Sequence, residues 1–171
     1  MTKQFRMNSV WACGMTAALA AGSIGVMRAQ TMTSVVENAS EAKWGPAPPM
    51  LPAGAQIAVL SGDPGKAAPY AVRLKFPANY AVPAHSHPTD EHVVVVSGTL
   101  TLGMGDKLSK TASGNKALGV GGFAIAAANM NHYAYTGSAA TTIVLYGTGP
   151  VEFKYVNPSD DPRNAKTTAA K

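Results

Sequence analysis

The sequence predicts one all-β domain that forms a small closed barrel or jelly roll. Three observations support this prediction. Glycine (17 residues) and proline (12 residues) are abundant in the 171-residue chain and recur between short apolar runs. Charged residues make up only 13% of the chain, which disfavours long solvated helices. About eight or nine short strands are predicted, and closing them into a barrel removes exposed strand edges.

Each strand is predicted where β-branched or alternating apolar residues lie between turn residues. Residues 70–76 are the clearest example, because Val72, Leu74 and Phe76 share one face and charged residues occupy the other. Residues 107–118 are predicted to be a polar loop. The remaining predicted strands are 56–60, 92–97, 99–104, 123–127, 133–136, 141–146 and 153–156.

Residues 1–29 are predicted to be an export signal. They combine a basic start at Lys3 and Arg6 with an apolar stretch over 10–27 and a small residue, Ala29, at the expected cleavage point. A transmembrane anchor is disfavoured, because the stretch is interrupted by glycine and only moderately apolar. We therefore expect an exported bacterial protein, periplasmic or extracellular, without stable membrane insertion after cleavage.

The barrel domain is expected to span residues 48–157. Before it, residues 30–47 are polar and low in pattern, and are predicted to form an N-terminal arm or a short helix. After it, residues 158–171 are polar and are predicted to be a disordered tail.

Composition excludes several classes of function. The chain carries a net charge of +5, but three of its 14 Lys and Arg residues lie in the first 29 positions, which contain no acidic residue. This leaves 11 basic against 9 acidic side chains, a net of +2, without a basic cluster, so we expect no nucleic-acid partner. The only cysteine, Cys13, lies in the predicted signal, which excludes disulfides, thiol nucleophiles and cysteine-ligated zinc in the mature chain.

Three of the four histidines, with one glutamate, form a pattern typical of a metal site. His85 and His87 are two residues apart, so in an extended chain both imidazoles point to the same face. Glu91 keeps that parity after a turn-prone Pro-Thr-Asp segment, whereas His92 points the other way. A further ligand must come from elsewhere in the chain, and His132 is the only histidine left. Three imidazoles and a carboxylate suit one divalent transition metal, such as Fe, Mn, Ni, Co, Cu or Zn.

These residues lie in two segments that resemble the cupin motifs. Residues 79–98 match G(X)5HXH(X)3,4E(X)6G, except that Asn79 replaces the opening glycine. In the second motif, G(X)5PXG(X)2H(X)3N, Gly121 and His132 match. The other three positions of that motif are occupied by Ala127, Asn129 and Thr136.

The chain thus resembles a small single-domain bacterial cupin, and the resemblance implies a jelly-roll barrel, also called a double-stranded β-helix. It also implies that the metal ligands are His85, His87, Glu91 and His132. The pocket is expected to be mostly apolar, and Tyr133, Tyr135 and Tyr146 are each either a source of a pocket hydroxyl or a core aromatic.

Two classes of function remain open at this stage. The first is a metal-dependent, dioxygenase-like enzyme acting on a small organic substrate inside the barrel, with Glu91 as ligand and candidate catalytic base. Isomerase or lyase chemistry would follow if the metal is redox-inert. The alternative is a non-enzymatic exported protein that binds a metal or a small molecule. A homodimer is expected in either case, because small cupins often pair through their sheets.

Overall fold

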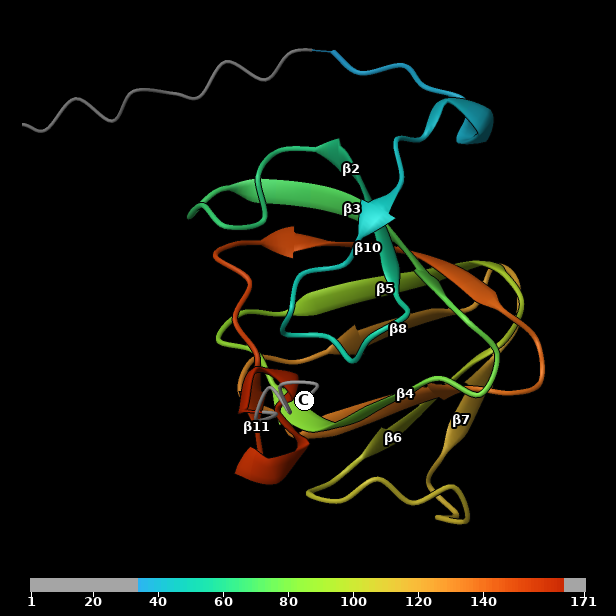
Figure 1. Ribbon diagram of the computed structural model, residues 1–171, viewed down its shortest axis with the longest axis vertical. Helices are drawn as coiled ribbons and strands as arrows, with labels where there is room; N and C mark the ends of the chain where they lie inside the picture. The colour runs from blue at the N-terminus through green and yellow to red at the C-terminus, as the bar shows by residue number, and fades with distance from the viewer. Residues whose placement is uncertain (1–33, 165–171) are drawn as a thin grey trace, which may run out of the picture. The chain divides into compact units, whose positions relative to one another are not determined.

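The computed structural model describes residues 34–164 as two antiparallel β-sheets with short connections (Figure 1). The first sheet contains, in spatial order, β1 (Gly45–Pro46), β2 (Gln56–Ser61), β3 (Pro69–Phe76), β10 (Thr141–Thr148), β5 (Glu91–Ser97) and β8 (Phe123–Ala126). The second contains β11 (Lys154–Tyr155), β4 (Ala81–Ser86), β9 (His132–Thr136), β6 (Leu100–Met104) and β7 (Lys116–Leu118). The helices among these residues are the one-turn 3-10 helices η1 (Ala39–Glu41), η2 (Pro158–Asp160) and η3 (Pro162–Asn164).

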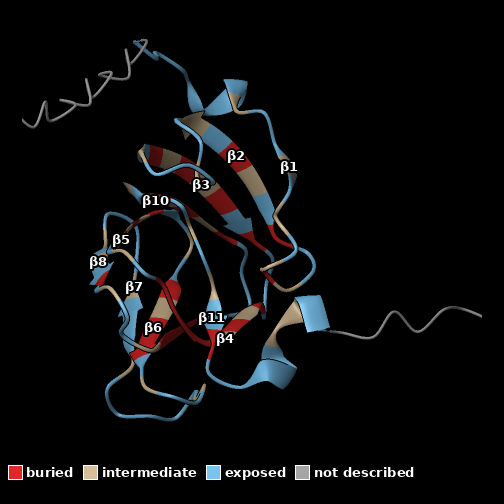
Figure 2. Cartoon of the chain, turned by 90° about the vertical axis from the view of Figure 1, so that its left-hand side faces the viewer, coloured by how far each residue is buried: buried red, intermediate tan, exposed pale blue. Residues whose placement is uncertain are grey.

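The core lies between the two sheets. Along β3, Tyr70, Val72, Leu74 and Phe76 are buried and alternate with more exposed residues, as the sequence pattern predicted. Figure 2 shows buried positions on strands of both sheets, including β3, β4 and β6. Each fully buried aliphatic or aromatic side chain contributes roughly 1.5–3 kcal/mol, so this shared interior holds the sheets together.

Two asparagines occupy glycine positions of the cupin motifs, and the backbone explains why. Asn79 has a φ of 56° and Asn129 a φ of 61°, both in the left-handed region that favours glycine. Asparagine is among the residues that tolerate this region best. Gly98 and Gly121, the retained motif glycines, have φ values of 75° and 79°. All four motif positions, two asparagines and two glycines, therefore have a left-handed backbone conformation.

The structure differs from the sequence prediction in three segments. β4 was not among the predicted strands, because Pro83 lies in its middle and interrupts the pattern. The predicted polar loop 107–118 ends in β7, a short edge strand that pairs with β6. Residues 158–164 were predicted to be disordered, but they form η2 and η3. There the Arg163 guanidinium donates to Asp161 and to the carbonyl of Phe153, which ties the segment to the barrel.

The predicted export signal, residues 1–29, lies outside the described residues, as do positions 165–171 of the predicted tail. Of the predicted arm, residues 34–47 are described, and β1 joins the first sheet by pairing with β2. Within residues 34–164, no helix is long and apolar enough to cross a membrane.

Candidate metal centre

The three histidines of the cupin motifs come from neighbouring strands of the second sheet. His85 lies near the end of β4 and stands directly opposite His132, the first residue of β9. His87 follows the last residue of β4. Glu91 comes from the facing sheet, as the first residue of β5. The site therefore lies between the two sheets, at the end of the barrel where these strands begin or end.

The side chains converge tightly. His85, His87 and His132 are buried, and each offers a ring nitrogen within 4.8 Å of the other two. Glu91 approaches two of them, with Oε1 3.4 Å from Nε2 of His87 and Oε2 3.9 Å from Nε2 of His132. These three buried histidines can hold a metal ion.

Backbone carbonyls fix the orientation of each imidazole. The Nδ1 atoms of His85, His87 and His132 lie 2.7, 2.7 and 3.0 Å from the carbonyl oxygens of Pro83, Glu152 and Met130. Because a carbonyl only accepts hydrogen bonds, each Nδ1 carries the proton and each Nε2 presents a lone pair to the centre. In metalloproteins, hydrogen bonds of this kind to the second ring nitrogen orient the histidines that bind the metal.

Two of the Nε2 atoms at the centre lack hydrogen-bond partners within residues 34–164. Nε2 of His87 and Nε2 of His132 are buried and make no hydrogen bond. Buried polar atoms without partners are costly, and here they face one another and a carboxylate, all as acceptors. A cation at this point would satisfy all of them, so the donor set fits a divalent metal.

Burial disfavours the charged form of every group in the centre. Desolvation raises the pKa of Glu91 to about 7, although the neighbouring His132 opposes this. Desolvation also lowers the pKa of His87 and of His132. The pKa of His85 lies well below its ordinary value, first because of desolvation and then because His132 and His87 are close. The imidazoles are thus held neutral, which is the form that binds metals.

Aromatic rings pack around the histidines. Phe153 stacks on His85, with ring centroids 4.6 Å apart and an angle of 15° between the planes, and meets His87 edge-on at 4.5 Å. Tyr155 lies beside His85 at 5.7 Å, and its hydroxyl donates to the carbonyl of Met50. These contacts hold the imidazole rings in place.

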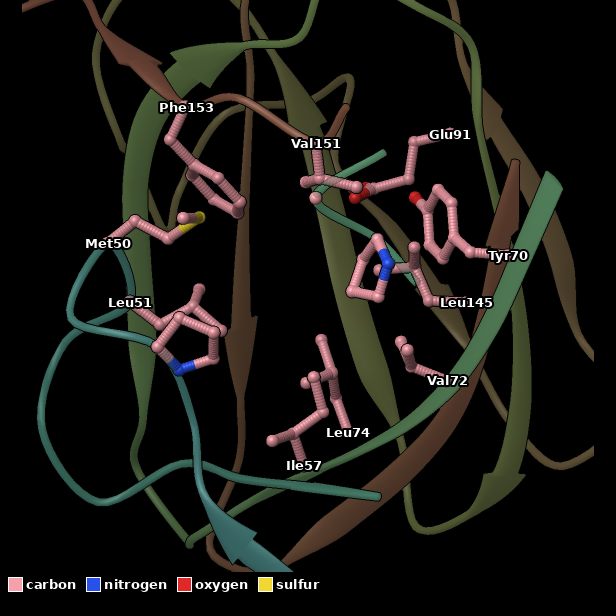
Figure 3. A pocket seen from close by; sticks show the side chains of 13 residues that line it. Met50, Leu51, Ile57, Tyr70, Val72, Leu74, Glu91, Leu145, Val151 and Phe153 are labelled. Atoms are coloured by element: carbon pink, nitrogen blue, oxygen red, sulfur yellow. The ribbon is translucent and has the colours of Figure 1, made fainter. Parts of the chain in front are cut away.

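Two hollows have Glu91 in their walls. The smaller, of about 30 Å³, is lined by His85, His132 and Glu91 together with apolar core residues. The larger, of about 210 Å³, has Glu91 in its wall and is otherwise bounded mainly by apolar side chains of β2, β3 and β10 and of the loops before β2 and after β10 (Figure 3). The expected apolar pocket is therefore present beside the histidines.

The structure separates the remaining candidates from the centre. Tyr133 is buried in the second sheet, and its hydroxyl bonds Ser109 and Asn115 instead of facing a cavity. The Tyr135 hydroxyl donates to a loop carbonyl, and Tyr146 is exposed. His92, predicted to point away, stacks on Tyr146 with ring centroids 4.9 Å apart.

Sequence reasoning missed Tyr70 and Phe153, which both line the larger cavity. The signal for Tyr70 was available, since it is two residues before the inward-facing Val72 on an alternating strand. Phe153 carried no such signal, because β11 begins only after it and its place depends on long-range packing.

Comparison with solved structures identifies the fold. The polyketide cyclase RemF from Streptomyces resistomycificus superposes with a TM-score of 0.59 at 16% identity, covering 76% of this chain and 90% of its own. A protein from Methylibium petroleiphilum PM1, provisionally assigned as an acetylacetone dioxygenase, gives a TM-score of 0.58 at 18% identity, covering 80% and 90%. An RmlC-like cupin from Shewanella frigidimarina gives 0.51 at 13% identity, covering 76% and 98%. The all-β cupin jelly roll predicted from the sequence is thereby confirmed.

At these identities the likeness extends to the fold alone. No curated protein sequence matches the chain. The family described as "Domain of unknown function (DUF4437)" matches residues 24–149, which is most of the chain. This cupin-fold chain is a member of the DUF4437 family.

Proposed function

We propose that this chain is a metal-dependent enzyme that acts on a small organic molecule inside the barrel. One observation carries the proposal: three buried imidazoles turn proton-free Nε2 atoms toward one another, beside a carboxylate and at the wall of an apolar cavity. His85, His87 and His132 would hold one divalent transition metal, with Glu91 as the fourth ligand.

Glu91 has two roles in this proposal. Its carboxylate faces His87 and His132 on one side and forms part of the wall of the larger cavity on the other. It can therefore bind the metal and also accept a proton from a molecule in the cavity. A metal bound here would act as a Lewis acid that polarises a substrate oxygen. The chain's own apolar residues exclude bulk water from that point.

The reaction that we favour is dioxygenase-like. Histidine-rich sites with a carboxylate and open positions suit ferrous iron and related redox-active metals. The cupin-fold structures named above include a polyketide cyclase and a provisionally assigned acetylacetone dioxygenase, so the same fold occurs in proteins with different reactions. With a redox-inert metal, isomerase or lyase chemistry would take its place.

We also propose that the mature protein is exported and dimeric. The basic and apolar pattern of residues 1–29 supports export, and the resemblance to small cupins supports a dimer. Cell fractionation and light scattering of the purified protein test the two statements separately.

Metal analysis of the purified protein tests the central proposal. We expect near-stoichiometric metal in the natural protein and in a His92→Ala control, and loss of the metal in His87→Ala. His92 is a suitable control because it neighbours Glu91 on the same strand but lies on the other face. Absence of metal from all three proteins, even after anaerobic reconstitution, would contradict the proposal.

Oxygen consumption then separates the enzyme from a binding protein. A metal-loaded protein that consumes oxygen with a small organic substrate supports the dioxygenase-like reaction. A protein that holds its metal but turns over no substrate, with or without oxygen, would instead be an exported metal- or small-molecule-binding cupin.

A further inference from the structure

The larger cavity has an almost entirely apolar lining. Within the described structure, its wall contains no lysine, arginine or histidine, and the two side chains that bring polar groups to it are Glu91 and Tyr70. Its volume of about 210 Å³ lies below the range of roughly 300–1,000 Å³ that is typical of drug-sized ligands. The occupant is therefore small and mainly apolar.

Tyr70 differs from the other buried tyrosines in its hydroxyl. The hydroxyls of Tyr80, Tyr133 and Tyr155 each donate to a backbone carbonyl. The Tyr70 hydroxyl makes no hydrogen bond among residues 34–164, and it is not one of their buried partnerless atoms, although only 6% of the residue is exposed. The hydroxyl is therefore accessible from the cavity that Tyr70 lines, and it is available to a molecule bound there.

The sheet register places this hydroxyl beside the metal centre. Gly147 on β10 pairs with Tyr70 on β3 and with Glu91 on β5, so Tyr70 and Glu91 flank one residue that has no side chain. A Cβ atom added at Gly147 would lie 3.5 Å from the Tyr70 hydroxyl and 2.8 Å from the carbonyl of Asp90. Figure 3 shows the Tyr70 hydroxyl and the Glu91 carboxylate turned toward the same part of the cavity. A tyrosine hydroxyl is protonated at neutral pH and can donate a hydrogen bond. Desolvation, and after it the nearby Glu91, raises the pKa of Tyr70 further.

We propose that the cavity binds a small uncharged molecule with an apolar body, and that the Tyr70 hydroxyl donates a hydrogen bond to a carbonyl or hydroxyl oxygen of that molecule. This assignment deepens the proposed function, and rests on it for treating the molecule as a substrate. For the metal-free protein it also disfavours a class of ligands, because an anion in this cavity would then lie beside Glu91 without a cation to pair with. Carboxylates and phosphorylated compounds are therefore poor occupants of the metal-free cavity.

Three probes of similar size test the assignment. Acetophenone offers a neutral carbonyl, toluene offers no polar atom, and benzoate carries a negative charge. Their dissociation constants would be measured by NMR titration on metal-free protein, so that binding is read without activity. We expect the natural protein to bind acetophenone more tightly than toluene and to show no measurable affinity for benzoate.

Tyr70→Phe removes only the hydroxyl. We expect it to weaken acetophenone binding by roughly 2- to 10-fold while leaving toluene binding unchanged. Tyr146→Phe is the matched control, because Tyr146 lies one register position away on the exposed face of the same sheet, and it should change neither value. Val151→Phe fills the cavity from its wall and should abolish binding of both probes without loss of metal.

Clear results would overturn the assignment. Equal loss of acetophenone binding in Tyr70→Phe and Tyr146→Phe, or tight binding of benzoate, would show that the Tyr70 hydroxyl does not select the ligand. Binding that survives Val151→Phe would place the probes elsewhere. Metal content, measured in parallel, keeps this result separate from the proposed function. If the protein holds metal but fails these probe tests, only the ligand assignment is wrong. If it passes the probe tests but never holds metal, only the proposed metal site is wrong.

Discussion

The two ends of this barrel differ in whether their buried polar side chains have hydrogen-bond partners. At the metal end, defined by His85, His87, Glu91 and His132, buried Nε2 atoms face one another without hydrogen-bond partners in the described chain. At the turn end, defined by Asn79, Gly98, Thr136 and Thr141, the two threonines are almost completely buried and fully engaged. Strands β9 and β10 run between the ends, so the same elements serve both.

At the turn end, two threonine hydroxyls each bind the backbone of a neighbouring turn in a similar way. The Thr136 hydroxyl donates to the carbonyl of Pro77 and accepts from the amide of Tyr80, bracing the turn that contains Asn79. The Thr141 hydroxyl donates to the carbonyl of Thr99 and accepts from its amide, bracing the turn at Gly98. Polar groups here stabilise the fold, whereas those at the metal end are left available to a ligand. Substitutions at one end should therefore change stability, and at the other metal affinity.

Gly98→Ala should have the largest effect, and it should fall on stability. Gly98 has a φ of 75°, and an added Cβ would lie 2.5 Å from the carbonyl oxygen of Ala140. Left-handed strain and the forced backbone shift together should cost about 3 kcal/mol or more in the free energy of unfolding. Denaturant unfolding measures this, with Gly114→Ala as control because nothing lies within 4 Å of its added Cβ. Equal losses in both variants would show that the Gly98 turn is not specially constrained.

Glu91→Gln should affect the metal end alone. We expect metal affinity to fall by about 100-fold, because an amide replaces the proposed carboxylate ligand. The metal-free protein should keep its stability or gain slightly, since an amide N–H can donate to a histidine Nε2 that otherwise lacks a partner. Competition with a coloured chelator gives the affinity, and denaturant unfolding without metal gives the stability. An unchanged affinity would remove Glu91 from the ligand set.

The sequence predicted the convergence of these histidines and Glu91 better than it predicted the contacts that hold them in place. Residue parity placed His92 on the face opposite Glu91, as found, and the same alternation buries Val93 and Val95 on the face of Glu91. The histidine spacing also placed His85 and His87 together. In contrast, the carbonyl that orients His87 belongs to Glu152, 65 residues away, and no local pattern reports such a contact. The order in residues 158–164 likewise depends on Arg163 reaching Phe153, which composition alone does not reveal.

Thr141→Val should have an intermediate effect at the turn end. Removing the fully buried Thr141 hydroxyl breaks both of its hydrogen bonds to the backbone of Thr99, which is itself an exposed residue. We expect a loss of about 1–3 kcal/mol in unfolding free energy, with metal content per folded molecule unchanged. The control is Thr142→Val on the next, half-buried position of the same strand, which should cost well under 1 kcal/mol. A loss of metal in Thr141→Val would mean that the two ends are coupled through β10.

The two left-handed asparagines allow the finest comparison, because one lies at each end. Asn79→Ala and Asn129→Ala should each cost about 1–2 kcal/mol in stability, since alanine adopts this conformation poorly. The backbone N–H of Asn129, however, donates to the backbone carbonyl of His87 at 2.7 Å, whereas the backbone N–H of Asn79 donates to the carbonyl of Gly137 at the turn end. We therefore expect only Asn129→Ala to lower metal affinity, by a few-fold, because a shift of that turn moves His87. The corresponding glycine variants should restore both properties, since glycine adopts a positive φ without strain. If Asn79→Ala weakened metal binding as much as Asn129→Ala, the barrel would respond as one unit and the division of roles between its ends would be wrong.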